Sequence, residues 1–273
     1  MNTNSKLAMV AFATIATVSL QAQTVTNALD NAGNYPGTSW PQAANNGYGF
    51  GNWTYNNTTP NGGFSGQFEG ASGGINSGNG NAFGFYANSG ANARAQAIAP
   101  FLGGALTAYQ TFSVQMQNSS ITDDGGQVGF SLQNGSGNNI FQFYFNGGAS
   151  DYYINVWTSL VSGVQIDTGV GYSSGPLTLA YSQGTTGNWT FDIYTGNTLA
   201  ATLDSVGTGD LVWQNGVSQV NLYNSNGGSS RSMGDNGNLF FNNLQITTVP
   251  EPSTLAICGL SGLATFFMIR RRR

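Results

Sequence analysis

Hydrophobic and polar residues alternate with a period of two along most of the chain between residues 24 and 248. In the segment 111–117, TFSVQMQ, the apolar residues Phe112, Val114 and Met116 alternate with polar neighbours. This period places the apolar side chains on one face of a β-strand. The segments that we expect to form strands are 50–55, 64–69, 82–86, 111–117, 127–133, 140–145, 152–157, 177–182, 188–194, 218–224 and 238–246.

Clusters of glycine, asparagine and serine separate these segments. Residues 133–139, QNGSGNN, and residues 145–150, FNGGAS, contain Asn-Gly and Gly-Gly steps, which accept the positive φ angles of hairpin turns. The pattern predicts an all-β body, an antiparallel two-sheet sandwich of the lectin-like or jelly-roll type. The nearest candidate for a helix, residues 95–106, is broken by Pro100 and by Gly103–Gly104.

The N-terminus has the three parts of a secretory signal peptide. Lys6 supplies a positive charge, residues 7–20 form a short apolar run, and Ala22 is a small residue suited to cleavage. We therefore expect residues 1–22 to be a signal peptide and residues 23–248 to be the exported body.

The C-terminus has a second apolar run that precedes a cluster of arginines. Leu255–Ile269 contains 15 residues without charge, and Arg270, Arg271, Arg272 and Arg273 end the chain. Because arginines cross a bilayer at high cost, they stop transfer and stay on the cytoplasmic side. The sequence predicts a single C-terminal transmembrane helix within residues 253–269, with the body outside the cytoplasm.

Pro250, Glu251 and Pro252 stand directly before this run, within the segment Val249–Thr254. The two prolines hold the chain extended around the glutamate. Motif, apolar helix and arginine cluster together resemble the PEP-CTERM sorting signal of Gram-negative surface proteins. The resemblance covers residues 249–273. It implies recognition of the motif by an exosortase-type processing enzyme, an inner-membrane-anchored precursor, and delivery to the cell surface or an exopolysaccharide-containing extracellular matrix.

The body carries few charges and is acidic. Charged residues make up 7% of the chain and aromatic residues 12%, which favours a folded domain with a polar, uncharged surface. Between the two ends, ten acids and two arginines, Arg94 and Arg231, leave a net charge of about −8. Such a surface does not neutralise phosphates, so nucleic acid and anionic lipid are poor partners.

The residues of the body do not favour catalysis. The chain has no histidine, its one cysteine, Cys258, lies in the C-terminal apolar run, and its one lysine lies in the signal peptide. Glu69 is the only glutamate before the tail, and Asp192 is expected to be solvated, on the strand face opposite Trp189. The sequence predicts a protein that is not an enzyme.

No cofactor or metal site is expected. Residues 235–238, Asp-Asn-Gly-Asn, lack the spaced acids of an EF-hand and are expected to form a turn. A calcium site built from scattered aspartates and backbone oxygens is left open.

Aromatic residues suggest a ligand. Five tryptophans and twelve tyrosines could offer flat rings to sugars, although such rings also fill cores. Trp40, in a loop next to Pro41, is expected to be the most exposed tryptophan, and Trp40 and Trp53 are the candidates for stacking on sugar rings. The sequence predicts an exported, surface- or matrix-associated, non-enzymatic protein. The alternative is a carbohydrate-binding module that holds exopolysaccharide.

Overall fold

A computed structural model describes residues 23–35, 40, 42–59, 63–88, 92–158, 163–209, 216–228 and 237–249. Thr24–Val249 form one compact unit. The expected signal peptide, the sorting motif, the C-terminal helix and the terminal arginines lie outside the described residues, as do Arg231 and Asp235.

The body consists almost entirely of strands. They are β1 (Val25–Asp30), β2 (Thr54–Tyr55), β3 (Phe64–Gly70), β4 (Ala82–Asn88), β5 (Arg94–Pro100), β6 (Gln110–Asn118), β7 (Gln127–Gln133), β8 (Asn139–Asn146), β9 (Asp151–Val156), β10 (Val164–Gly171), β11 (Leu177–Gln183), β12 (Trp189–Thr195), β13 (Thr198–Asp204), β14 (Gln219–Ser225) and β15 (Leu239–Thr248), with two short 3₁₀ turns, η1 (Ala32–Asn34) and η2 (Thr185–Gly187).

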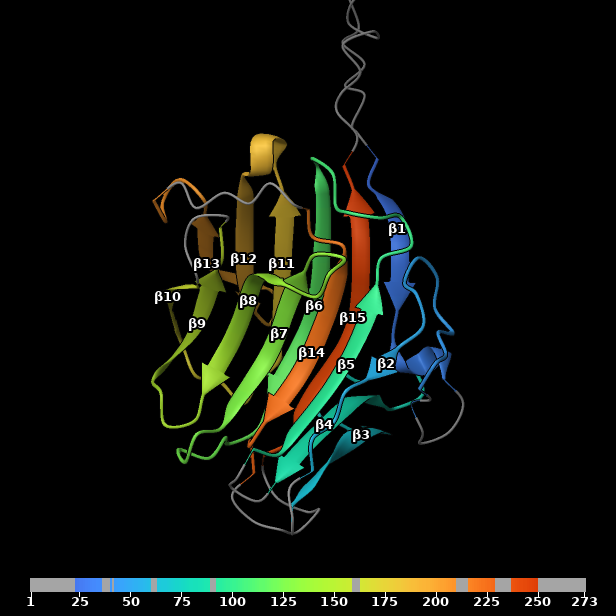
Figure 1. The fold of residues 1–273 in the computed structure, drawn as a ribbon, viewed down its shortest axis with the longest axis vertical. Helices are drawn as coiled ribbons and strands as arrows, with labels where there is room; N and C mark the ends of the chain where they lie inside the picture. The colour runs from blue at the N-terminus through green and yellow to red at the C-terminus, as the bar shows by residue number, and fades with distance from the viewer. Residues whose placement is uncertain are drawn as a thin grey trace, which may run out of the picture. The chain divides into compact units, whose positions relative to one another are not determined.

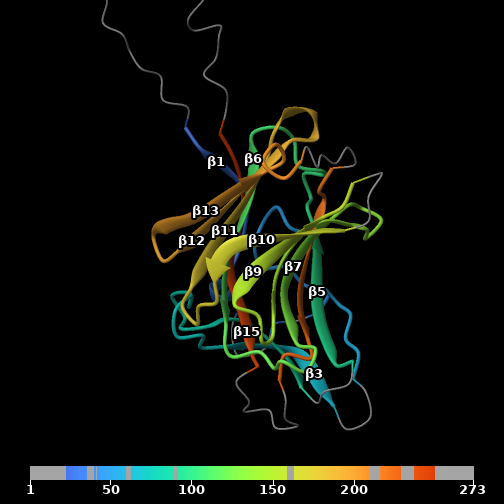
Figure 2. The same ribbon diagram turned by 90° about the vertical axis from the view of Figure 1, so that its left-hand side faces the viewer.

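The strands form two antiparallel sheets that pack face to face, which confirms the expected sandwich (Figures 1 and 2). One sheet has eight strands in the order β13-β12-β11-β6-β15-β4-β3, with β1 also paired to β15. The other has seven strands in the order β10-β9-β8-β7-β14-β5-β2. Neighbours in the sheets are often distant in sequence, so long-range pairing determines the fold.

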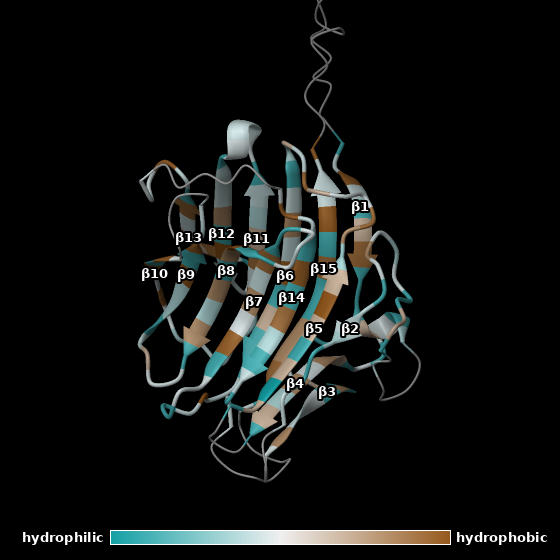
Figure 3. Cartoon of the chain, viewed as in Figure 1, coloured by the Kyte–Doolittle hydropathy of each residue, from teal (hydrophilic) through white to brown (hydrophobic). Residues whose placement is uncertain are grey.

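Alternation along the strands builds the core, and Figure 3 shows it as hydrophobic and hydrophilic bands. The predicted apolar face of β6 is fully buried, as are Val128, Phe130 and Leu132 of β7 in the opposite sheet. Rings meet across the interface: Phe191 of β12 lies 4.7 Å from Phe141 and 5.5 Å from Phe143 of β8, between ring centroids. Such ring pairs add to the free energy of area burial.

Strand β15 changes its pairing partner halfway along its length. Its first residues pair with β4, its last residues pair with β1, and the register with β6 shifts between Asn242 and Gln245. Asn242 is fully buried at this junction, where its side chain accepts a hydrogen bond from Ala32 N and donates one to Ser77 Oγ. The amide thereby satisfies polar groups of η1 and of the loop between β3 and β4.

Strands β1, β5, β10 and β13 were not expected. β5 occupies the segment nearest to a helix in sequence, but its alanines at positions 95, 97 and 99 are buried and follow the period of a strand. Small alanines give a weak hydrophobic signal, so the alternation is inconspicuous. Pro100 stands at the end of the strand, where a missing N–H is tolerated.

A buried carboxylate organises the end of the sandwich near β1. Asp30 is fully buried and accepts hydrogen bonds from Trp53 Nε1 at 2.8 Å, Tyr35 Oη at 2.9 Å and Asn34 Nδ2 at 3.2 Å. Burial raises the pKa of Asp30, and the three hydrogen bonds oppose that rise.

Glu69 of β3 is the second acid in this region, and it lacks the hydrogen bonds of Asp30. Its side chain is 4% exposed, and neither carboxyl oxygen has a hydrogen-bond partner. Burial, and after it the negative charge of Asp30, raise the pKa of Glu69 from 4.5 to about 7. Burial, and after it the charges of Tyr35 and Glu69, raise the pKa of Tyr55.

We expect Asp30→Ala to lower the free energy of unfolding of the body by about 3 kcal/mol, because the Trp53 and Tyr35 donors would be left buried without an acceptor. Urea denaturation of residues 23–249 measures the change. Asp192→Ala is the matched control and should cost under about 1 kcal/mol, because its carboxylate accepts one hydrogen bond, from Thr202, on the outer face of β12. Equal losses in the two variants would contradict the role given to Asp30.

The body should become less stable as the pH rises from about 4.5 to about 7. In this range native Glu69 keeps a proton that the unfolded chain releases, so the free energy of unfolding falls with pH. Asp30 contributes in the same direction. Glu69→Gln should reduce the fall in melting temperature between pH 5 and pH 8, measured by circular dichroism. A wild-type slope that persists in Glu69→Gln would contradict the assignment.

Candidate functional site

The two tryptophans expected to stack on sugars are both buried, so that prediction is wrong. Trp40 is 4% exposed and Trp53 is fully buried. Trp40 stacks on Phe83 at 4.2 Å and meets Trp53 edge to face at 4.7 Å, between ring centroids. Trp53 donates its indole N–H to Asp30. Their rings therefore belong to the core, and neither presents a face to a ligand.

The outer face of the seven-stranded sheet gathers polar side chains instead. This sheet faces the viewer in Figure 1, and no strand lies in front of it. The residues that alternate with the core positions on its strands are mostly amides and tyrosines. We call them the amide–tyrosine face: Gln96, Gln127, Ser131, Gln133, Gln142, Tyr144, Tyr153, Asn155, Asn221 and Tyr223.

A chain of hydrogen bonds crosses four strands of this face. Asn155 Nδ2 donates to Gln142 Oε1 at 3.1 Å, and Gln142 Nε2 donates to Tyr223 Oη at 2.6 Å. Tyr223 Oη donates to Gln127 Oε1 at 3.2 Å, and Gln127 Nε2 donates to Asn146 Oδ1 at 3.0 Å. Each amide is held in one orientation by its neighbours. Gln142 and Tyr223 are buried, whereas Gln127 and Asn155 are half-buried and partly open to solvent.

Gly129 explains how Tyr223 reaches across the sheet. Tyr223 on β14 and Tyr144 on β8 are the register partners of Gly129 on the strand between them. A Cβ on Gly129 would lie 2.1 Å from the carbonyl oxygen of Phe143. With no side chain there, the Tyr223 ring can lean over β7 toward Gln142 of β8. Burial raises the pKa of Tyr223, which keeps this phenol uncharged.

One buried acceptor on the face has no partner. Asn221 is 3% exposed, and its Oδ1 makes no hydrogen bond. Asn221, Ser131, Gln142 and Asn155 are register partners in one row across β14, β7, β8 and β9. An unsatisfied buried acceptor costs free energy, and this oxygen is closed to solvent, so the row is tightly packed at its β14 end.

Aromatic rings border the row on β9. Tyr144 stacks on Tyr153 with 5.9 Å between ring centroids, and Tyr153 is half-buried. Trp157 lies just after β9, two residues beyond Asn155, and is also half-buried. Its ring lies over Gly163, where an added Cβ would be 3.1 Å from Trp157 Nε1. Tyr153, Asn155 and Trp157 thus alternate ring, amide and ring along one edge of the face.

The charged residues of this surface lie at its margins. Arg94 stands at the β5 end of the row that contains Gln127, while Asp167 on β10 is the register partner of Tyr153. Asp151 lies at the start of β9, where its carboxylate accepts a hydrogen bond from Ser150 Oγ at 2.5 Å. The centre of the amide–tyrosine face therefore carries hydrogen-bonding groups without charge.

Three other acids of the described body, Asp30, Glu69 and Asp192, lie away from this face. Asp30 and Glu69 are buried between the sheets, and Asp192 lies on the outer face of the other sheet, as expected. Within the described residues, no three acids or cysteines lie close enough to hold a metal ion. No helix in the described part of the chain is long and apolar enough to cross a membrane.

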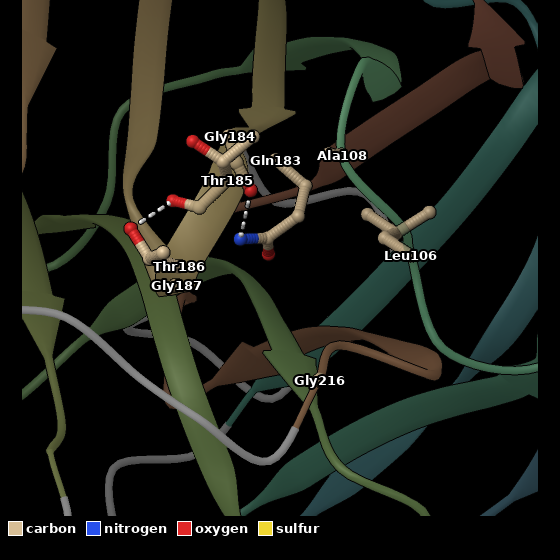
Figure 4. A pocket seen from close by; sticks show the side chains of 8 residues that line it. All are labelled: Leu106, Ala108, Gln183, Gly184, Thr185, Thr186, Gly187 and Gly216. Atoms are coloured by element: carbon tan, nitrogen blue, oxygen red, sulfur yellow. Dashed lines mark hydrogen bonds between the residues drawn. The ribbon is translucent and has the colours of Figure 1, made fainter.

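A separate hollow of about 470 Å³ lies beside η2 (Figure 4). It is bordered by residues 183–187 and by Leu106, Ala108 and Gly216, and none of these residues is ionisable. Gln183 Nε2 donates to Gly184 O, and Thr186 Oγ1 donates to Thr185 O. Since these polar side chains bond within their own turn, the hollow offers less to a polar ligand than the amide–tyrosine face does.

Sequence reasoning missed the amide–tyrosine face although part of its signal is visible. Gln142 and Tyr144 alternate with phenylalanines in the β8 segment, as do Asn221 and Tyr223 with Val220 and Leu222 in β14. The pattern shows that these side chains point outward. It does not show that β14 lies beside β7 and brings them together.

Comparisons with solved structures return distant similarities. An endo-β-1,4-glucuronan lyase from the fungus Trichoderma reesei has 11% identity and a TM-score of 0.44, covering 71% of this chain and 94% of that one. The exoplasmic/lumenal domain of VIP36, bound to Ca²⁺ and Man3GlcNAc, has 10% identity and a TM-score of 0.43, covering 74% and 89%. An alginate lyase from Alteromonas sp. 272 has 10% identity and a TM-score of 0.38, covering 57% and 79%. Similarity at this level indicates neither a shared activity nor a shared ligand.

The end of the chain gives the informative match. No curated protein matches the chain. Residues 248–273 match the family model of the PEP-CTERM protein-sorting motif, which confirms the resemblance carried by Pro250, Glu251, Pro252 and the terminal arginines. The motif implies export, a membrane-anchored precursor and processing by an exosortase. The chain is therefore an exported protein that carries a C-terminal PEP-CTERM sorting signal.

Proposed function

We propose that this chain is a non-enzymatic component of the cell surface or extracellular matrix, with the β-sandwich as the part that is delivered. The observation that carries the proposal is the sorting motif at residues 248–273, joined to a compact body at Thr24–Val249. The apolar run 253–269 would hold the precursor in the inner membrane, with Arg270–Arg273 on the cytoplasmic side.

The chemistry of the body supports a role without catalysis. The chain has no histidine, and its only cysteine and only lysine lie near its two ends. Glu69 has a raised pKa, but it is buried, and burial alone accounts for most of that rise. Asp192 and Thr202 both lie on the eight-stranded sheet, away from the amide–tyrosine face, and Asp192 accepts a hydrogen bond from Thr202 there. No cofactor is part of the proposal.

A carbohydrate-binding role is the second candidate, and the amide–tyrosine face favours it. Its half-buried amides, Asn155 and Gln127, are ordered, uncharged donors and acceptors on the same face as half-buried rings, which is the mixture that sugar hydroxyls and ring C–H groups require. Exopolysaccharide is the ligand expected where a sorting motif of this kind delivers a protein.

The sorting proposal predicts different defects for the two parts of the tail. Changing Arg270–Arg273 to serines should let the precursor slip through or misorient, because each arginine opposes passage by about 2.5–3.5 kcal/mol at the bilayer centre. Glu251→Ala should leave insertion intact, but uncut precursor should accumulate in the membrane. Both are measured by cell fractionation with an epitope tag after Gln23. Normal processing and release of both variants would contradict the proposal.

A further inference from the structure

We propose that the amide–tyrosine face binds a neutral polysaccharide, with Tyr153 and Trp157 stacking on its sugar rings and the half-buried amides of Asn155 and Gln127 binding its hydroxyls. This inference rests on the proposed surface location, because that location brings the body to polysaccharide. It assigns to one face of the body a ligand class that the sorting motif leaves open.

The hydrogen-bond chain on the face suits hydroxyl groups. Its members, Asn155, Gln142, Tyr223 and Gln127, are fixed by one another, so binding would immobilise few additional side chains. Each sugar hydroxyl can donate and accept at once, which matches the amide N–H groups and amide oxygens of the half-buried Asn155 and Gln127. Gln142 and Tyr223 are buried and hold these two amides in place.

The rings on β9 suit a chain of sugars. Tyr153 and Trp157 are four residues apart on the same face, so their Cα atoms are separated by roughly 13 Å. This separation covers more than one sugar ring, and Asn155 lies between the two aromatic side chains. Both rings are half-buried, so each is held against the sheet while part of its surface meets solvent.

Charge selects a neutral polymer over an acidic one. The body carries about −8 charges, and Asp151 and Asp167 lie at the β9 and β10 margin of the face. Arg94 is the only arginine among the described residues, and it stands on β5, at the opposite side of the sheet. Carboxylated polysaccharides would approach Tyr153 and Trp157 against this acidic margin and are therefore disfavoured.

The test is native affinity electrophoresis of the full-length chain in mild detergent. The gels contain barley β-glucan, dextran or yeast mannan, with sodium alginate as the acidic control. We expect at least one neutral polysaccharide to retard the wild type more than alginate does. Tyr153→Ala combined with Trp157→Ala should weaken that binding about tenfold or more, since two ring contacts are lost.

Tyr194→Ala is the matched control, because Tyr194 is a half-buried tyrosine on the outer face of the other sheet. It should bind like the wild type. Circular dichroism confirms that each variant is folded. Asn155→Leu, which removes a half-buried amide between the two rings while keeping the size of the side chain, should weaken binding without loss of rings. No retardation in any neutral gel, or equal retardation of wild type and the Tyr153/Trp157 variant, would overturn the proposal.

Two further readouts separate this inference from the proposed function. If a second copy of the chain covers the face instead, light scattering would show a dimer that the Tyr153/Trp157 variant dissociates, and the glycan proposal would be overturned. The same variant should be sorted and processed normally in cells, since the tail is unchanged. Release of reducing ends from the polysaccharides would contradict the non-enzymatic part of the proposed function while leaving binding to the face in place.

Discussion

Aromatic packing between the two sheets is the contact on which the rest of the molecule depends. The only cysteine, Cys258, lies in the tail, so no disulfide can join the strands of the body. Rings such as Phe130, Phe143 and Phe191 fill the interface, and each buried side chain of this size contributes roughly 2–3 kcal/mol. The packed interface fixes the strand order, and the strand order brings β14, β7, β8 and β9 together.

The same alternation produces the interior and the proposed binding surface. On β8, Phe141, Phe143 and Phe145 point inward, while Gln142 and Tyr144 point outward. Side-chain hydrogen bonds between neighbouring strands then fix the outward amides, which occupy positions where many proteins carry charged groups. A surface with so few charges avoids attracting ions and acidic polymers, yet it keeps many donors and acceptors, which is consistent with a protein that works among uncharged polysaccharides.

Periodicity predicted the two-sheet architecture and the buried faces of β6, β7 and β15, because strong apolar alternation is a local signal. It failed where the signal was weak or the cause was distant. The alanines of β5 gave little hydrophobic contrast. The buried Trp53 ring has its N–H satisfied by Asp30, 23 residues earlier in the chain, and no pattern around Trp53 shows that bond. The sorting motif was readable because it is contiguous, whereas the amide–tyrosine face is assembled from strands far apart in sequence.

The most direct test of the central claim is a titration of isotope-labelled body, residues 23–249, with neutral β-glucan and mannan oligosaccharides, followed by nuclear magnetic resonance. The side-chain amide signals of Gln127 and Asn155 and the indole signal of Trp157 report on the face individually. Our account predicts that these signals shift together and saturably, while the Trp53 indole signal, bonded to Asp30 in the core, stays in place. Shifts confined to the other sheet, or no saturable shift with either oligosaccharide, would contradict it.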